Sequence, residues 1–479
     1  MLFNSIEFLI FCPLVFLMYW FVFKSLRCQN LFIVVVSYVF YGWWNYRFLF
    51  LIALTTFCSF VSGLLVEKYS QRKIKKLITT SNIILNLAIL CVYKYYNFFV
   101  ESFEDMMSLV GLNITPPLLH IVLPVGISFY TFQALSYTID VYKNKIKPTH
   151  DIVAFFAFIS FFPQLVAGPI ERATNLLPQF LKPRRFDYSQ AVDGMRQILW
   201  GFFKKIVVAD NCAVLVNTIF DNYQNYDGMT LLFGGIFFTF QIYGDFSGYS
   251  DIAIGTARLF GINLMRNFAF PYFSRNIAEF WRRWHISLNT WFRDYIYFPL
   301  GGSRCSKLKV IRNTMVIFLV SGFWHGANWT FVTWGAYHAL LFVPLFLLGQ
   351  NRKFTNIVAE GKCLPSLMEM SQMLLTFVCV LVGWILFRSA TIADFAGYMD
   401  HMISSFAVVK PSCRLNALVF IVLLMVVEWM NRHKQHGLQI DGTGRMMRYR
   451  VVRWITYATI LLIIVSFSGS QSDFIYFQF

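Results

Sequence analysis

The sequence predicts an all-α protein that crosses a membrane many times. Of its 479 residues, 57% are hydrophobic, 19% are aromatic and only 14% are charged, whereas soluble domains carry about 25% charged residues. The mean hydropathy is +0.56. Apolar stretches of about 20 residues, the length that crosses a hydrocarbon core of roughly 30 Å, recur along the chain. These observations exclude an ordinary soluble globular protein.

We expect about 11 to 13 transmembrane or re-entrant helices around a transmembrane tunnel, together with interfacial helices. The apolar stretches lie, in order, near residues 6–23, 29–43, 48–66, 78–98, 118–139, 151–168, 195–219, 229–262, 313–348, 370–388, 415–431 and 451–468. No small-residue cleavage site follows Met1, so residues 6–23 are expected to remain as the first span. Some stretches are short or interrupted by Gly, Pro and polar residues, which favours broken helices.

The distribution of basic residues predicts the orientation of these spans. Lys and Arg gather at 68–76, 143–147, 182–185, 266–312 and 432–453. The loops at 99–116 and 221–228 hold acidic residues but no Lys or Arg. Because basic loops stay in the cytoplasm, both termini are expected on the extracytoplasmic side of the inner membrane. The net charge of +17 then reflects topology and attraction to anionic lipid, and nucleic-acid binding is not expected.

One membrane core is expected over residues 1–432. A cytoplasmic basic hinge follows at 433–450, and a last span with an outer tail follows at 451–479. The nine cysteines are scattered without a metal-binding spacing, so we expect neither a structural metal, nor a disulfide framework, nor a bound cofactor.

Two histidines lie within strongly apolar sequence and are the main functional candidates. His285 occurs in Trp281-Arg-Arg-Trp-His285, and His325 occurs in Phe323-Trp-His-Gly-Ala-Asn-Trp329. Imidazole titrates near neutral pH, so a histidine at membrane depth predicts a functional site, with proton transfer as the leading idea. A histidine hydrogen-bonded between helices is the structural alternative. His338 is interpreted as structural.

The segment at 263–312 is rich in Arg and Trp and is expected at the membrane surface. Apolar residues at helical spacing over 280–298 predict an interfacial amphipathic helix. Arg282, Arg283 and Trp284 are candidates for binding a phosphate-bearing donor, because guanidinium groups match phosphate geometry. Snorkelling arginines and belt tryptophans are the alternative interpretation.

Several long motifs together resemble the membrane-bound O-acyltransferase family. They include Trp281 to Gly302, Phe323 to Trp329 and Trp334-Gly-Ala-Tyr-His338. Further matching stretches are Pro124 to Gln133, Ser136 to Tyr142, Phe162 to Ile170 and Tyr243 to Asp251. The sequence is similar to the bacterial branch of alginate and peptidoglycan O-acetyltransferases and the teichoic-acid D-alanyl transfer protein. The likeness covers about residues 1–432.

The resemblance implies that His325 is the catalytic histidine and His285 the second site residue. An acyl thioester is already activated, so the missing element is a base for the acceptor hydroxyl, which typically contributes 10²–10⁴-fold. Asp245, Trp324 and Asn328 are candidates for lining the tunnel, although a helix-packing hydrogen bond is the simpler role for Asp245.

The last residues, Phe474-Ile-Tyr-Phe-Gln-Phe479, resemble the C-terminal element of the small single-span protein that accompanies the D-alanyl transfer protein. A phenol can accept an acyl group and pass it on, so Tyr476 is a candidate acyl carrier. An aromatic anchor for the last helix is the alternative.

The sequence therefore predicts an O-acyltransferase that moves an acyl group, expected to be acetyl, across the membrane to a cell-surface polysaccharide or peptidoglycan. The expected donor is acetyl-CoA or an acyl carrier protein thioester on the cytoplasmic side, and an extracytoplasmic transferase is the expected partner. Transfer of D-alanyl or another acyl group is the first alternative. A non-enzymatic transporter or flippase is the second, although the internal repeat typical of transporters is not evident.

Overall fold

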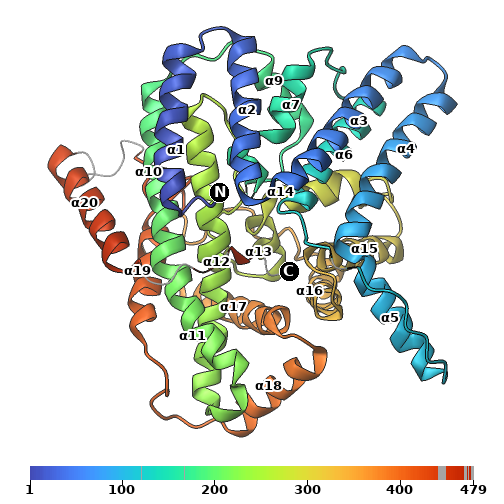
Figure 1. Cartoon of the computed structure of the whole chain (residues 1–479). Helices are drawn as coiled ribbons and strands as arrows, with labels where there is room; N and C mark the ends of the chain where they lie inside the picture. Colours follow the sequence, from blue (N-terminus) through green and yellow to red (C-terminus); the bar gives the residue numbers. More distant parts are fainter. Residues whose placement is uncertain (120, 167, 441–448, 469–471, 473, 476–479) are drawn as a thin grey trace. The chain divides into compact units, whose positions relative to one another are not determined.

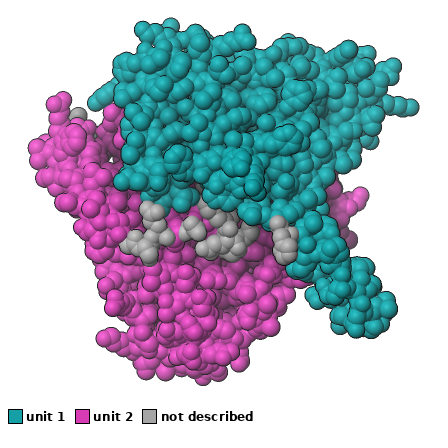
Figure 2. Space-filling model, viewed as in Figure 1, with its two compact units in different colours: residues 1–191, 256–265 teal, residues 192–255, 266–479 magenta. Residues whose placement is uncertain are grey.

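The computed structural model describes residues 1–119, 121–166, 168–440, 449–468, 472 and 474–475. Throughout these residues the regular structure is helical, without a β-strand. The chain forms two compact units. The first comprises residues 1–191 and 256–265, and the second comprises residues 192–255 and 266–479 (Figure 2). Residues 433–440 and the last helix fall in the second unit, and the division at residue 432 stays a prediction.

The first unit contains nine α-helices among its described residues, labelled in part in Figure 1. They are α1 (Ile6–Leu17), α2 (Leu26–Asn45), α3 (Leu49–Lys68), α4 (Arg72–Leu90), α5 (Tyr96–Leu109), α6 (Ile127–Tyr142), α7 (Ile152–Ser160), α8 (Phe162–Leu165) and α9 (Ala173–Phe180). Short π-helical or 3₁₀ segments join some of them, namely η1 (Met18–Val22), η2 (Tyr46–Phe48) and η3 (Cys91–Tyr95).

The second unit carries the functional candidates. The helix α10 (Tyr188–Phe202) enters it and continues through the π-helical segment η4 (Phe203–Ala209) into α11 (Asp210–Asp221). The remaining elements are η5 (Tyr223–Asn225), α12 (Gly228–Leu259), η6 (Pro271–Phe273), α13 (Ile277–Arg283), α14 (Ile286–Phe292), η7 (Arg293–Tyr297), α15 (Lys307–His325), α16 (Trp329–Leu347), α17 (Leu367–Arg388), α18 (Ile392–Ser404), α19 (Asn416–Met430) and α20 (Arg450–Ser466).

The protein is a multi-pass membrane protein. Among the described residues, five helical stretches are long and apolar enough to cross a bilayer: Leu26–Lys68, Arg72–Leu109, Gly228–Leu259, Trp329–Leu347 and Leu367–Arg388. Two shorter helical stretches, Ile6–Val22 and Asn416–Met430, are also apolar. The apolar stretch expected at 313–348 is divided at His325, and the one at 151–168 is divided between α7 and α8.

Close backbone packing joins α12 to α10 and η4 within the second unit. A Cβ atom on Gly248 would lie 2.8 Å from the carbonyl oxygen of Gly201, and one on Gly201 would lie 2.7 Å from that of Gly248. Small residues permit this approach, as in many membrane helix pairs. The approach places Lys204 and Lys205 of η4 against the acidic side chains of α12.

Candidate functional site

The structure brings the two predicted histidines together. His325 is the last residue of α15, and His285 lies in the break between α13 and α14. Both are buried, with 3% and 1% of their surfaces exposed. Their ring centroids are 6.2 Å apart at an interplanar angle of 73°. Residues 40 positions apart in the sequence thus form one buried pair within the second unit.

The helix predicted across 280–298 is broken at the functional position. It is divided into α13, α14 and the π-helical segment η7, and His285 takes a left-handed backbone conformation with φ +45°. Such a conformation costs a residue with a side chain about 1–2 kcal/mol, so its surroundings must hold it.

Hydrogen bonds from other parts of the chain supply that support. The amide of Ile286 donates to the carbonyl of Asn267 at 2.9 Å, and the hydroxyl of Ser287 donates to the side chain of Asn267, also at 2.9 Å. The side-chain amide of Asn289 donates to the carbonyls of Trp281 and Trp284 at 2.7 and 2.6 Å. These contacts explain why a helix predicted from local periodicity ends at Arg283.

Aromatic rings enclose both imidazoles. His285 lies 4.6 Å from the ring of Phe246 and 5.9 Å from that of Trp324. His325 lies 5.3 Å from Trp334 and 5.6 Å from Phe387, measured between ring centroids. Within the described structure, neither ring nitrogen of His285 has a hydrogen-bond partner. Trp324, a tunnel-lining candidate, therefore contacts the site, although the tunnel itself remains a prediction.

Burial controls the charge of His285. This residue lies outside the candidate membrane-spanning helices, and desolvation lowers the pKa of its imidazole from 6.5 to about 3. It is consequently neutral at physiological pH and can accept one hydrogen bond while donating another. Such a ring can orient a reacting group without adding charge to the site.

The other predicted tunnel residues take different positions. Asp245 of α12 is buried and pairs with Lys205 at 2.8 Å. The oxygen of the Asn328 side chain accepts the amide of Thr330 at 3.0 Å, and its nitrogen donates to the carbonyl of Ala390 at 2.9 Å. Asn328 therefore caps the start of α16. The predicted acyl carrier Tyr476 lies outside the described residues.

Two of the predicted donor-binding residues, Arg282 and Arg283, belong to a polar network at the end of α13. Arg283 donates to the carboxylate of Glu279 at 2.8 Å and to the carbonyl of Ala269 at 3.2 Å. Arg282, which is exposed, donates to the carbonyl of Asn351 at 2.7 Å. Trp284 is buried and packs against Trp384, with 4.8 Å between ring centroids. Arg282 is thus the more accessible of the two arginines.

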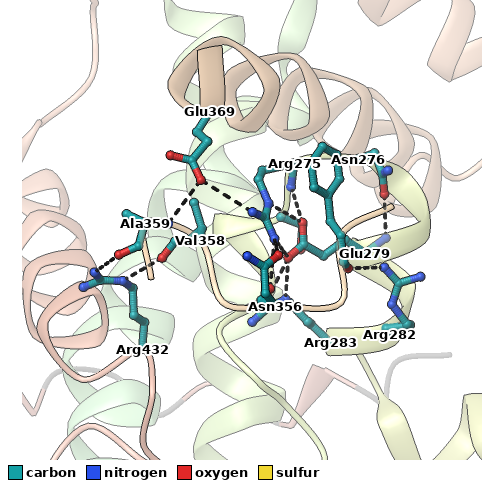
Figure 3. A network of polar contacts seen from close by, with 12 residues as sticks. Arg275, Asn276, Glu279, Arg282, Arg283, Asn356, Val358, Ala359, Glu369 and Arg432 are labelled. Carbon is teal, nitrogen blue, oxygen red and sulfur yellow. Dashed lines mark hydrogen bonds and ion pairs between the residues drawn. The ribbon is translucent and has the colours of Figure 1, made fainter. Parts of the chain in front are cut away.

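Glu279 is the centre of this network, and sequence reasoning did not single it out (Figure 3). It also pairs with Arg275 at 3.1 Å, and Arg275 donates to Asn356 and contacts Glu369. A carboxylate with 1% of its side chain exposed requires such partners. Glu279 and Arg283 lie one turn apart on α13, and Arg275 precedes that helix by two residues. The four-residue spacing of Arg275, Glu279 and Arg283 in the sequence was the signal that could have predicted the network.

A second group of buried charges also escaped sequence reasoning. Lys204 pairs with Asp251 at 2.6 Å, and Lys205 pairs with both Asp245 and Asp210 at 2.8 Å. A helix-packing hydrogen bond was predicted for Asp245, whereas the identity of its partner was not. The signal that could have predicted buried acidic partners was the pair of lysines at 204 and 205, inside the apolar stretch at 195–219.

Comparison with known proteins shows which protein family the chain is similar to. The model of the membrane-bound O-acyltransferase family matches residues 31–366. A probable alginate O-acetylase AlgI of Pseudomonas aeruginosa is 38% identical over 81% of this chain and 72% of its own length. The peptidoglycan O-acetyltransferase of Helicobacter pylori is 30% identical over 100% of this chain and 98% of its own length. The teichoic acid D-alanyltransferase of Bacillus subtilis is 30% identical over 45% of this chain and 57% of its own length.

Proposed function

Because the chain belongs to the membrane-bound O-acyltransferase family, we propose that it moves an acetyl group from a cytoplasmic thioester to a cell-envelope polymer. The protein is a membrane O-acyltransferase, and membership of this family of enzymes argues against a role in transport alone. The observation that carries the proposal is the buried pair of His285 and His325, with ring centroids 6.2 Å apart.

The proposed chemistry uses His325 as a general base. The acceptor hydroxyl gives its proton to the imidazole as its oxygen bonds to the acyl carbon. The carbon–sulfur bond then breaks, and the proton passes to the departing thiolate. A positioned base of this kind contributes about 10²–10⁴-fold to the rate. His285, held neutral by burial, would orient the thioester carbonyl or the acceptor.

Two of the similar proteins support acetyl as the transferred group. The alginate O-acetylase and the peptidoglycan O-acetyltransferase are both named for acetyl transfer, and the alignment with the latter covers the whole chain, including the C-terminal residues. A cell-surface polysaccharide or peptidoglycan is therefore the proposed acceptor. D-alanyl transfer remains the alternative, supported by the similarity to the teichoic acid enzyme over a shorter region.

The donor and the direction of transfer belong to the proposal. The donor would be acetyl-CoA or an acyl carrier protein, with the exposed Arg282 available to its phosphate and Trp284 and Arg283 shaping the entrance. Tyr476 would receive the acetyl group as an aryl ester and present it outside the membrane. An extracytoplasmic transferase is the proposed partner. The enzyme would lie in the inner membrane with both termini on the outer side.

Replacement of His325 tests the proposal. Purified protein incubated with radiolabelled acetyl-CoA, or with a carrier-bound acetyl thioester, should transfer label to an acceptor. His325→Gln should lower the rate about 10²–10⁴-fold, because it removes the base while keeping a polar side chain of similar size. Its thermal unfolding should be compared with that of the unaltered protein, and His401→Gln serves as a control at a half-buried histidine of α18. Normal turnover by folded His325→Gln would refute the assignment.

A further inference from the structure

The described C-terminal residues are bound by buried polar groups of the second unit. The backbone amide of Ile475 donates to the carboxylate of Asp245 at 2.6 Å. The ammonium group of Lys205 donates to the backbone carbonyl of Ser472 at 2.9 Å. Phe474 and Ile475 are 0% and 2% exposed. Phe474 and Ile475 therefore lie in the protein interior.

Lys205 joins the two carboxylates to this segment. Its ammonium contacts Asp210 and Asp245, each at 2.8 Å, as well as the Ser472 carbonyl. The hydroxyl of Ser472 donates to Asp210. The ammonium donates to Asp210 and to the Ser472 carbonyl, and it forms an ion pair with Asp245. Both carboxylates also accept a donor from the C-terminal segment, so the segment contributes a hydrogen bond to each of them.

The composition of this group explains why it suits a peptide backbone. Two carboxyl groups share one ammonium group in a buried place, where a polar group without a partner is costly. The amide of Ile475 and the hydroxyl of Ser472 supply further donors to these two carboxyl groups.

The same segment lies close to the histidine pair. The ring of Phe474 is 4.4 Å from that of Tyr249 and 6.1 Å from that of Phe246, and Phe246 is 4.6 Å from His285. A single aromatic side chain thus touches both the segment and the second site histidine. The residue that follows Ile475 in the sequence is Tyr476.

We propose that Lys205, Asp210 and Asp245 form a clamp that binds the chain's own C-terminal segment through Ser472 and Ile475 and positions the residue after Ile475 for the histidine site. Binding of the segment is inferred from the contacts of Ser472 and Ile475 with these three residues. Only the purpose of the binding, delivery of Tyr476 to the acyl group, rests on the proposed function. The three clamp residues are positioning residues rather than catalytic ones.

The neighbouring lysine provides a matched control. Lys204 of η4 is also buried, and it pairs at 2.6 Å with Asp251, which lies on α12 as Asp245 does. Asp251 additionally accepts a hydrogen bond from Gln197 at 2.8 Å. The hydrogen bonds of Lys204 and Asp251 among the described residues do not include Ser472 or Ile475. Loss of either lysine breaks a buried ion pair of η4 with α12, but of the two lysines it is Lys205 that donates to the C-terminal segment among the described residues.

Hydrogen–deuterium exchange of the C-terminal peptide, followed by mass spectrometry on purified full-length protein, tests the clamp. Lys205→Met should accelerate exchange of the buried amides by at least about tenfold, because it frees the segment to open. Lys204→Met should leave their exchange within about twofold of the unaltered protein. Slow exchange in folded Lys205→Met, or equal acceleration in both variants, would overturn the proposal.

A change on the segment itself keeps the test decisive should Lys205→Met fail to fold. Ile475→Pro removes the amide that donates to Asp245, and Ile475→Val retains it with nearly the same side chain. The proline variant should accelerate exchange at the amides of Ser472 and Phe474, whereas the valine variant should not; equal protection of these two amides in both variants would refute the clamp. Acyl transfer is measured separately. If a variant releases the segment but transfers acyl groups normally, the clamp proposal stands and the carrier role of Tyr476 is rejected.

Discussion

At the scale of single residues, His285 combines a constrained backbone with an uncharged side chain. Its left-handed conformation turns the chain between α13 and α14, and its ring lies against Phe246 and Trp324. Conformations of this kind persist only where surrounding contacts over-determine them, and they gather at functional sites. Here the contacts come from Asn267 and Asn289. The position of the imidazole therefore depends on two asparagines, Asn267 and Asn289.

The lowered pKa of His285 predicts an acid sensitivity of the fold. Its pKa is about 3 in the folded protein and about 6.5 when unfolded. Between these values the unfolded chain binds a proton that the folded chain does not, so stability falls as pH decreases below about 6.5. From pH 7 to pH 5 this group should remove about 2 kcal/mol.

His285→Gln replaces the titrating ring by a neutral group, so the loss of stability between pH 7 and pH 5 should be smaller by that amount. Unfolding of both proteins in detergent at the two pH values measures it. The same pH dependence in the two proteins would show that the ring is not buried in its neutral form.

At the scale of elements, the functional side chains lie where regular α-helices end or are interrupted. His325 ends α15, His285 separates α13 from α14, and Lys205 lies in the π-helical segment η4 between α10 and α11. The sequence around His285 contains neither Gly nor Pro, so local signals predicted one continuous helix. The break at Trp284–His285 is stabilised by hydrogen bonds from Asn267 and Asn289, and contacts of that kind are not visible in periodicity.

The packing of α12 against α10 and η4 predicts a sharp difference between two glycines of one helix. Ala at Gly248 would place its Cβ 2.8 Å from the backbone carbonyl of Gly201, whereas Ala at Gly235 meets only the flexible side chains of Ile385 and Leu381, at 3.0 Å or more.

Gly248→Ala should therefore destabilise the protein by about 1–3 kcal/mol through overpacking. Gly235→Ala should be neutral or stabilising by up to about 1 kcal/mol, because alanine favours a helix. Thermal unfolding of the two variants measures this difference in stability. Equal stability of the two variants would mean that α12 and α10 can move apart at Gly248 without a cost in free energy.

At the scale of the whole molecule, the predictable features were those carried by local sequence. The membrane class followed from the length of apolar runs, and the two histidines followed from motifs whose residues are contiguous. The partners Glu279 with Arg275 and Arg283, and Lys205 with Asp210 and Asp245, were not predicted as pairs, because hydrophobic pattern says nothing of which charges meet. Likewise the contact of Ile475 with Asp245 joins residues 230 positions apart. The division into two units also depends on such long-range contacts.

The proposed path of the acyl group across the whole molecule predicts the effect of removing one oxygen atom. In sealed inside-out membrane vesicles the cytoplasmic face is accessible, and radiolabelled acetyl-CoA added there should yield label on an acceptor enclosed in the lumen. Tyr476→Phe removes the phenol oxygen that would form the aryl ester, so delivery should fall by at least about 10²-fold. The histidine pair and the clamp residues are unchanged in this variant, so the thioester should still bind.

Tyr449→Phe is the matched control, because Tyr449 is exposed just before α20 and should not affect delivery. Full delivery by Tyr476→Phe would mean that the acceptor hydroxyl itself reaches His325, and that the C-terminal segment anchors the last helix rather than carrying the acyl group.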